Sequence, residues 1–311
     1  MEGIKIIGYG HALPEKIVSN EDLSKMVDTS DEWISSRTGI KNRYVSEQET
    51  NAGLSLAAAK EAIADSGKKE EDLDLILLAT VTPDYVTPSV ACRVAAELSV
   101  KKEIPVFDFN AACSGFLYGL YLADRLLKVG QCALLMATEQ LSKITDFTDR
   151  STCVLFGDGS GAVVVEKKKE VSFDCFVGAD GNAEPLYCKS LRFTEDAYIH
   201  MNGKEVFRFA VDKIQKSIAR ILEQNHLTID DIDYVVCHQA NYRIIDYVRK
   251  KLHAPEEKFF CNIQNYANTS AASIPLALYD MRQQGLLCQG KKVIVVGFGG
   301  GFTWGAALLD C

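Results

Sequence analysis

The sequence lacks the patterns that would make it a metal-binding or disulfide-rich chain. No Cys-x-x-Cys pair occurs, and the five histidines form no cluster with the spacing of a zinc site. The ten cysteines are scattered over 311 residues, mostly in apolar runs, whereas disulfide scaffolds are typical of short secreted chains. We therefore expect reduced thiols, no bound metal and a cytoplasmic location.

The features of membrane-spanning and nucleic-acid-binding proteins are missing as well. The longest uncharged run, 293–309, contains five glycines and predicts two strands around a glycine turn rather than a membrane span. The first residues lack the basic region and long apolar stretch of a signal peptide. Because 42 acidic residues outnumber 34 Lys and Arg, the net charge is −8, which disfavours general binding to nucleic acid.

A weak internal repeat predicts the architecture. Segments 71–78 and 230–236 each run from an acidic loop into an apolar strand, and helices and a second apolar strand follow each of them. Each half then closes with a glycine turn and a strand. Alternating strands and helices with continuous apolar strands indicate an α/β fold with mostly covered sheets. We divide the chain into two related halves, 1–168 and 169–311.

Cys113 is the first candidate for chemistry. It lies where a short apolar strand, 105–109, meets a helix that begins near Ser114. The free N–H groups and the positive dipole end at a helix N-terminus stabilise an anion, so the pattern predicts a thiol with a lowered pKa that acts as a nucleophile. The alternative is a small core cysteine.

Three further candidates come from the second half. His238 follows an apolar strand at 234–236, and α/β sheets bind ligands at such strand ends, so it is a candidate acid, base or hydrogen-bond donor. The alternative is a structural loop histidine. The Asn268 amide could donate to an oxyanion, although a helix cap is its more ordinary role. Gly299 to Gly301 would let backbone N–H groups approach a ligand, or they form a hairpin turn.

Two groups of charged and aromatic residues could bind partners. A capping box, Thr29 to Glu32, starts a helix that carries Trp33 and Arg37 on one face, where they could hold an adenine or a phosphate. The alternative is a surface helix with a half-buried tryptophan. A basic group could dock an acidic partner or form a solvated helix face. Its members are Arg243, Arg249, Lys250 and Lys251 on one predicted helix and Arg208 outside it.

Six segments together resemble the condensing enzymes of the thiolase superfamily, in particular the β-ketoacyl-[acyl carrier protein] synthase III family. They are 28–40, 111–116, 155–159, 238–241, 268–273 and 299–305, in the family's order. The resemblance implies a five-layer αβαβα fold of two duplicated halves, a homodimer, and Cys-His-Asn chemistry on Cys113, His238 and Asn268. Two positions depart from the family pattern without touching this chemistry, since Cys237 often corresponds to proline and Ser114 to alanine.

The resemblance also implies the reaction. An acyl-CoA primer would acylate Cys113, malonyl-acyl carrier protein would lose CO₂, and the resulting enolate would form 3-oxoacyl-acyl carrier protein, which initiates type II fatty acid synthesis without a cofactor. Backbone N–H groups of Cys113 and Gly300 would hold the oxyanion, and Phe298 would help to exclude water. The residues implied in CoA binding are Thr29, Trp33, Arg37, Arg150 and Asn241. Thr87 stands where some relatives carry phenylalanine at the end of the acyl pocket, which implies room for longer or branched primers.

Three alternatives remain at this stage. The first is an acyltransferase or secondary-metabolism condensing enzyme with the same fold, although simple acyl transfer does not need the His238 and Asn268 pair. The second is a thioester hydrolase, for which we expect a water-activating carboxylate near Cys113, and the sequence suggests none because Asp108 lies in a buried strand. The third is a binding module, which would not need the three residues together.

Overall fold

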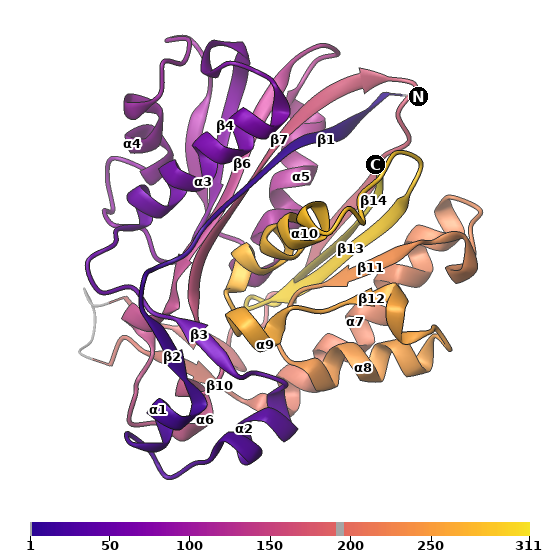
Figure 1. Ribbon diagram of the computed structural model, residues 1–311. Coiled ribbons are helices and arrows are strands. Elements are labelled where there is room, and N and C mark those ends of the chain that lie inside the picture. The colour runs from indigo at the N-terminus through magenta and orange to yellow at the C-terminus, as the bar shows by residue number, and fades with distance from the viewer. Residues whose placement is uncertain (1, 191–195) are drawn as a thin grey trace.

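Two five-stranded sheets form the framework of the computed structural model, which describes residues 2–190 and 196–311 (Figure 1). The first sheet has the order β1 (Glu2–Ala12), β7 (Asp158–Lys169), β6 (Cys132–Gln140), β4 (Leu73–Ala79) and β5 (Val106–Phe109). The second has the order β8 (Asp174–Ala179), β14 (Thr303–Asp310), β13 (Lys292–Gly299), β11 (Tyr234–Cys237) and β12 (Phe259–Phe260).

The two sheets share one topology. In the first, β4 is parallel to both of its neighbours, β5 and β6, and β7 is antiparallel to β6 and β1. In the second, β11 is parallel to β12 and β13, and β14 is antiparallel to β13 and β8. The predicted duplication is therefore confirmed strand by strand.

The helices form three layers around these sheets. The helices α5 (Gly115–Leu126) and α10 (Ser273–Gln283) lie between the sheets, where their apolar side chains share one core with strands of both halves (Figure 1). The helices α3 (Asn51–Ser66) and α4 (Val90–Glu97) cover the outer face of the first sheet, and α7 (Gly203–Gln224) and α8 (Tyr242–Lys251) cover that of the second. The predicted five-layer αβαβα arrangement is confirmed.

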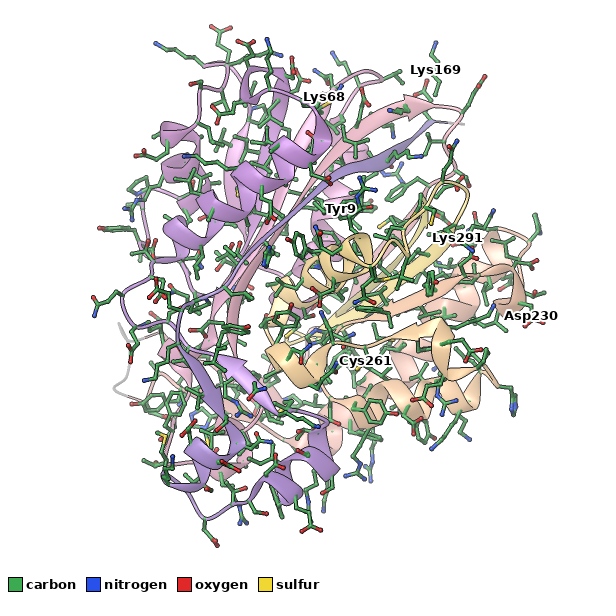
Figure 2. All side chains as sticks on the ribbon, viewed as in Figure 1. Tyr9, Lys68, Lys169, Asp230, Cys261 and Lys291 are labelled. Atoms are coloured by element: carbon green, nitrogen blue, oxygen red, sulfur yellow. The ribbon has the colours of Figure 1, made fainter. Side chains whose placement is uncertain are left out.

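Burial on both faces explains the continuous apolar strands. All nine residues of β6 are buried, as expected for a strand between two helical layers. Figure 2 shows Tyr9 of β1 near the middle layer, where the Arg282 guanidinium of α10 lies 5.9 Å from its ring centroid. Among the charged residues that the figure labels, Lys169 and Asp230 lie at the outer edge of the view.

Short elements are added at one end of this framework. They are β2 (Ile17–Ser19), α1 (Asn20–Ser24), α2 (Asp31–Thr38), β3 (Asn42–Tyr44), α6 (Arg150–Cys153), β9 (Leu186–Cys188), β10 (Ile199–Met201) and α9 (Ile263–Tyr266). Within residues 2–190 and 196–311, no helix combines the length and the apolar character needed to cross a bilayer.

Candidate active site

A cavity of about 1200 Å³ lies at the carboxyl ends of the parallel strands. Cys113, His238 and Asn268 all line it, together with Phe298 and Gly300. Asn268 follows the short helix α9, and the other four residues follow or end strands of both halves, so the cavity depends on the packing of the two sheets against the shared middle layer. The structure therefore brings together the three side chains that the sequence singled out for chemistry.

Cys113 lies in a tight turn just before α5. The turn is the short helix η2 (Ala112–Ser114), and α5 begins at Gly115. Gly299 of β13 passes directly over it, since a Cβ at that position would lie only 2.7 Å from the Cys113 amide nitrogen. A side chain at 299 would push the strand away from the turn that carries the thiol.

The Cys113 thiol does not have the lowered pKa that its place in the sequence predicts. Its pKa is raised to about 12, and burial is the largest cause; a hydrogen bond with Ser270 lowers the pKa in part, and the nearby negative charge of Glu139 raises it. The sequence-based prediction is wrong because removal of water from a thiolate disfavours the charged form. The thiol is therefore protonated at neutral pH, and its proton must be removed when the sulfur attacks.

His238 is a neutral hydrogen-bond donor. It is 1% exposed, and burial lowers its pKa to about 3. Its Nδ1 lies 2.7 Å from the Ser273 hydroxyl oxygen, which also accepts the Gln239 N–H at 3.3 Å. Among the described hydrogen bonds, Nδ1 is the acceptor to which the Ser273 hydroxyl can donate its proton. Nδ1 then carries no hydrogen of its own, so the network assigns the ring hydrogen to Nε2. The edge contact with Phe298, 5.4 Å between ring centroids, holds the imidazole from a second side.

The Asn268 amide is oriented by its neighbours. Its Oδ1 accepts the Ser270 N–H at 2.8 Å, which leaves the NH₂ group free to donate. Its backbone N–H donates to the Leu155 carbonyl at 2.9 Å, and its own carbonyl accepts the Gly157 N–H at 3.0 Å. His238 and Asn268 thus provide two uncharged N–H donors to the cavity that holds Cys113.

A buried carboxyl close to Cys113 was missed by the sequence analysis. Glu139 in β6 is 0% exposed, and its Oε1 accepts the Ser270 hydroxyl at 3.0 Å. Burial raises its pKa to about 7. The expectation that no carboxylate lies near Cys113 is therefore wrong. The available signal was a single acidic residue near the end of an otherwise uncharged strand, 132–140.

The residues expected to bind CoA form a separate cluster, apart from Asn241, which lines the cavity. The guanidinium groups of Arg37 and Arg150 lie 4.5 Å and 4.9 Å from the Trp33 ring centroid. Arg150 also donates to the Asp28 carbonyl at 2.7 Å. A flat base between Trp33 and Arg150 needs two van der Waals separations, about 7 Å in all, so Arg150 must move outward to admit it.

Two polar side chains, Thr29 and Asn241, differ in whether their oxygen atom already has a hydrogen-bond partner in the protein. The Thr29 hydroxyl is buried and has no hydrogen-bond partner within the described part of the chain, so it is free to receive one from a ligand. The Asn241 side-chain oxygen instead caps α8 by accepting the Arg243 N–H at 2.9 Å. The NH₂ group of Asn241 is the part of its side chain that remains to donate to a ligand.

The basic group divides into free and paired members. Arg208 of α7 and Arg243 of α8 are exposed, and neither makes an ion pair within residues 2–190 and 196–311. The Arg249 side chain is 19% exposed, lies 2.7 Å from Asp246 and donates to the Ala254 carbonyl at 3.2 Å. Lys250 lies 2.6 Å from the same Asp246 carboxylate. In the described part of the chain, Arg208, Arg243 and Lys251 therefore offer charge that no ion pair compensates, and the Lys251 ammonium lies 5.7 Å from the Tyr247 ring centroid.

Thr87 does not line the cavity in the single chain. It is exposed, whereas Pro83, Asp84 and Val86 of the same loop contribute to the cavity wall. Val86 is 85% exposed in spite of its apolar side chain. The described residues contain no group of three or more His, Cys, Asp or Glu side chains that could hold a metal ion.

Comparison with known proteins gives consistent matches over the whole chain. The model of 3-oxoacyl-[acyl-carrier-protein (ACP)] synthase III matches residues 107–181, and that of its C-terminal part matches 222–311. The β-ketoacyl-[acyl-carrier-protein] synthase III of Clostridium acetobutylicum is 49% identical, with 99% of each chain covered. The crystal structure of 3-oxoacyl-[acyl-carrier-protein] synthase III from Aquifex aeolicus is 44% identical and superposes with a TM-score of 0.94, covering 99% of this chain and 100% of that one. A priming β-ketosynthase from the R1128 polyketide pathway is 33% identical, with a TM-score of 0.91 and coverage of 99% and 96%.

Proposed function

The chain belongs to the 3-oxoacyl-[acyl-carrier-protein] synthase III family, and on this basis we propose that it catalyses the initiating condensation of type II fatty acid synthesis. The substrates are an acyl-CoA and malonyl-acyl carrier protein, and the products are 3-oxoacyl-acyl carrier protein, CoA and CO₂. The observation that carries the proposal is the single cavity lined by Cys113, His238 and Asn268. We assign the nucleophile to the first and the two oxyanion donors to the others.

The first half-reaction is acylation of Cys113. The sulfur attacks the thioester carbon of the primer, and CoA leaves. The carbonyl oxygen becomes negative in the transition state, and we assign its stabilisation to the backbone N–H groups of Cys113 and Gly300, two residues that line the cavity. Phe298, which is 2% exposed, limits access of water to the acyl-enzyme.

The second half-reaction is decarboxylative condensation. Loss of CO₂ from the malonyl group places negative charge on its thioester oxygen. The His238 Nε2–H and the Asn268 NH₂ donate to this oxygen, and both are uncharged donors in a site with little water. The enolate carbon then attacks the acyl carbonyl, and the Cys113 thiolate is expelled.

Several assignments accompany this function. Thr29, Trp33, Arg37, Arg150 and Asn241 hold the CoA nucleotide and pantetheine. The reaction needs no cofactor, and the protein works in the cytoplasm, where its substrates are made. We place the boundary between the two functional halves, 1–168 and 169–311, at the last residue of β7, just before the connection to β8, with the nucleophile in the first half and both oxyanion donors in the second.

The test is mass spectrometry of Cys113 after incubation with a panel of acyl-CoAs, followed by addition of malonyl-acyl carrier protein. We expect an acyl mass on the Cys113 peptide, then its loss with release of CO₂ and formation of 3-oxoacyl-acyl carrier protein. Release of free carboxylic acid in place of condensation would instead indicate a hydrolase. The burial of Glu139 argues against that activity, because both of its oxygens already accept hydrogen bonds from the protein.

Charge reversal at Arg243 is expected to weaken use of the carrier protein. Carrier proteins of this pathway are acidic, and an uncompensated arginine beside the cavity is a suitable docking group. We expect Arg243→Glu to raise the KM for malonyl-acyl carrier protein about tenfold, which corresponds to about 1.4 kcal/mol, while acyl-CoA priming is nearly unchanged. Arg208→Glu should act in the same direction.

Two controls separate docking from general effects of charge. Lys60→Glu makes the same change on the exposed face of α3, in the other half, and should leave the KM unchanged. Arg249→Glu places a carboxylate beside Asp246 and should lower the melting temperature as well as the activity. Equal loss in both half-reactions for Arg243→Glu would exclude it from docking.

A homodimer is the assembly that we propose. The strand β5 lies at the edge of the first sheet with its outer backbone unpaired in the single chain, and the adjoining loop exposes Tyr85 at 53% and Val86 at 85%. An exposed edge strand beside apolar side chains is suited to pairing with a second copy. We propose that in such a dimer the exposed Thr87 of this loop closes the end of the partner's acyl pocket.

The choice of primer tests this arrangement. Each buried CH₂ contributes about 0.8 kcal/mol, or roughly fourfold in affinity, so a deep pocket should favour primers of four or more carbons. We expect Thr87→Phe to reduce activity with these primers and to spare acetyl-CoA. Val86→Phe is the variant matched to Thr87→Phe. It introduces the same side chain at the neighbouring position, and Val86 lines the cavity of its own chain. If wild-type protein strongly prefers acetyl-CoA, the deep-pocket hypothesis is wrong.

A further inference from the structure

A chain of polar groups leads from the nucleophile into the core of the first half. The Ser270 hydroxyl is hydrogen-bonded to the Cys113 thiol and donates to Glu139 Oε1 at 3.0 Å. Ser270 is 2% exposed and Glu139 is 0% exposed, so bulk water does not compete for these bonds. Ser270 has a left-handed backbone, with φ of +51°, and its N–H is held by Asn268. The hydroxyl is thus fixed between the sulfur and the carboxylate.

The other carboxylate oxygen is held separately. Glu139 Oε2 accepts the Val81 N–H at 3.0 Å, the Thr82 hydroxyl at 3.1 Å and the Thr80 hydroxyl at 3.4 Å. These three donors orient the carboxyl group so that Oε1 faces Ser270. No charged side chain is bonded to Glu139 in the described ranges, and Cys113 is the titratable group that faces it. The nearby Asp158 of β7 precedes Gly159, which pairs with Glu139 in the sheet. Its carboxylate accepts hydrogen bonds from Ser46 and Ser142 instead.

The nucleophile needs such a proton acceptor. Burial raises the pKa of Cys113 to about 12, so the attacking sulfur carries its proton. His238 is a poor acceptor, because burial lowers its pKa to about 3 and Ser273 occupies its Nδ1. Glu139 has a pKa of about 7 and is about half ionised at neutral pH, which makes it the stronger base of the two.

We propose that Ser270 passes the proton of the Cys113 thiol to Glu139 as the sulfur attacks the acyl-CoA thioester. The step rests on the proposed function, which supplies the acyl-CoA. The S–H bond breaks while the bond from sulfur to the acyl carbon forms, the Ser270 oxygen receives this proton, and its own hydrogen moves to Glu139 Oε1. The bond from the acyl carbon to the CoA sulfur then breaks. The CoA thiolate takes up the proton that Glu139 gives back, so the sum is acyl transfer between two thiols.

The roles of the two residues differ. Ser270 touches the reacting sulfur and is a catalytic residue in this scheme, whereas Glu139 acts through Ser270. After the transfer, the Ser270 hydroxyl donates to the sulfur and Glu139 is neutral, so the negative charge that opposes a thiolate is removed at the moment of attack. A merely electrostatic Glu139 would have the opposite effect, because its permanent charge only raises the pKa of the thiol.

The test is the single-turnover rate of Cys113 acylation by acetyl-CoA, measured by mass spectrometry between pH 5.5 and 9. For wild-type protein we expect the rate to rise with a midpoint near pH 7, where Glu139 becomes ionised, and then to level off. Glu139→Gln keeps the shape of the side chain but cannot accept the proton. It should lower the rate at pH 8 about 100-fold, abolish the midpoint, and leave the acetyl-CoA concentration at half-saturation within about twofold.

Ser270→Ala is the second variant, and it leaves Glu139 in place. It should cause the same loss, and both variants should lack the solvent deuterium isotope effect on acylation that the wild-type protein shows. A Glu139→Gln rate equal to or above wild type would overturn the proposal, as would a normal rate for Ser270→Ala. If Glu139→Gln fails to fold, as judged by circular dichroism, Ser270→Ala decides. Absence of any acyl adduct on wild-type Cys113 with every acyl-CoA of the panel would instead contradict the proposed function.

Discussion

Cys113→Ser is expected to abolish formation of the acyl-enzyme. A serine hydroxyl is far less acidic than a thiol, and burial raises the pKa of even the thiol to about 12 at this position. Removal of a covalent nucleophile usually costs roughly 10⁴-fold or more in rate. Intact-protein mass spectrometry after incubation with acetyl-CoA should therefore show no acyl mass within the time in which wild-type protein is fully modified.

Cys288→Ser is the matched control for this variant. It makes the same chemical change at an exposed cysteine outside the cavity lining, so acylation should proceed at the wild-type rate. An acyl adduct that forms on Cys113→Ser at the normal rate would show that the nucleophile is another residue. Peptide mapping identifies which one, since every cysteine lies at a different place in the sequence.

Loss of either oxyanion donor is expected to separate the two half-reactions. His238→Ala and Asn268→Ala should still allow acylation of Cys113, because the thioester oxygen of the primer is held by backbone N–H groups. Decarboxylation of malonyl-acyl carrier protein should fall roughly 10²- to 10³-fold in each variant. Release of ¹⁴CO₂ from labelled malonyl-acyl carrier protein measures this step directly, and a normal rate in either variant would contradict the two-donor scheme.

The pH dependence of the two half-reactions should differ in the same experiments. Burial lowers the pKa of His238 to about 3, so the neutral ring is present at every pH above that value. Decarboxylation should therefore show no midpoint near pH 6.5, the ordinary value for histidine. Acylation should show one near pH 7, and that midpoint belongs to Glu139. Ser273→Ala removes the partner of His238 Nδ1 and should slow decarboxylation alone.

The sequence by itself predicted the architecture, which the structure confirms, and it supplied the hypothesis for the reacting side chains. Apolar strands that alternate with helices, repeated twice, predicted the duplicated α/β fold because the hydrophobic period of each element is a local property. A cysteine at a strand-to-helix junction, a histidine after a strand and an asparagine before a helix pointed to one site, since strand ends of an α/β sheet meet at one edge. The resemblance to condensing enzymes joined these separate patterns.

Only the tertiary structure decided how those groups behave. The pKa of Cys113 depends most on the water that the whole fold removes from it, and this burial cannot be read from the strand-to-helix junction in the sequence. The contact between Glu139 and Ser270 joins residues 131 positions apart and leaves no local pattern. The pairing of Arg249 and Lys250 with Asp246, by contrast, follows from their i,i+3 and i,i+4 spacing on α8 and could have been predicted from the sequence. Desolvation and distant contacts are set by packing, and packing exists only once the chain has folded.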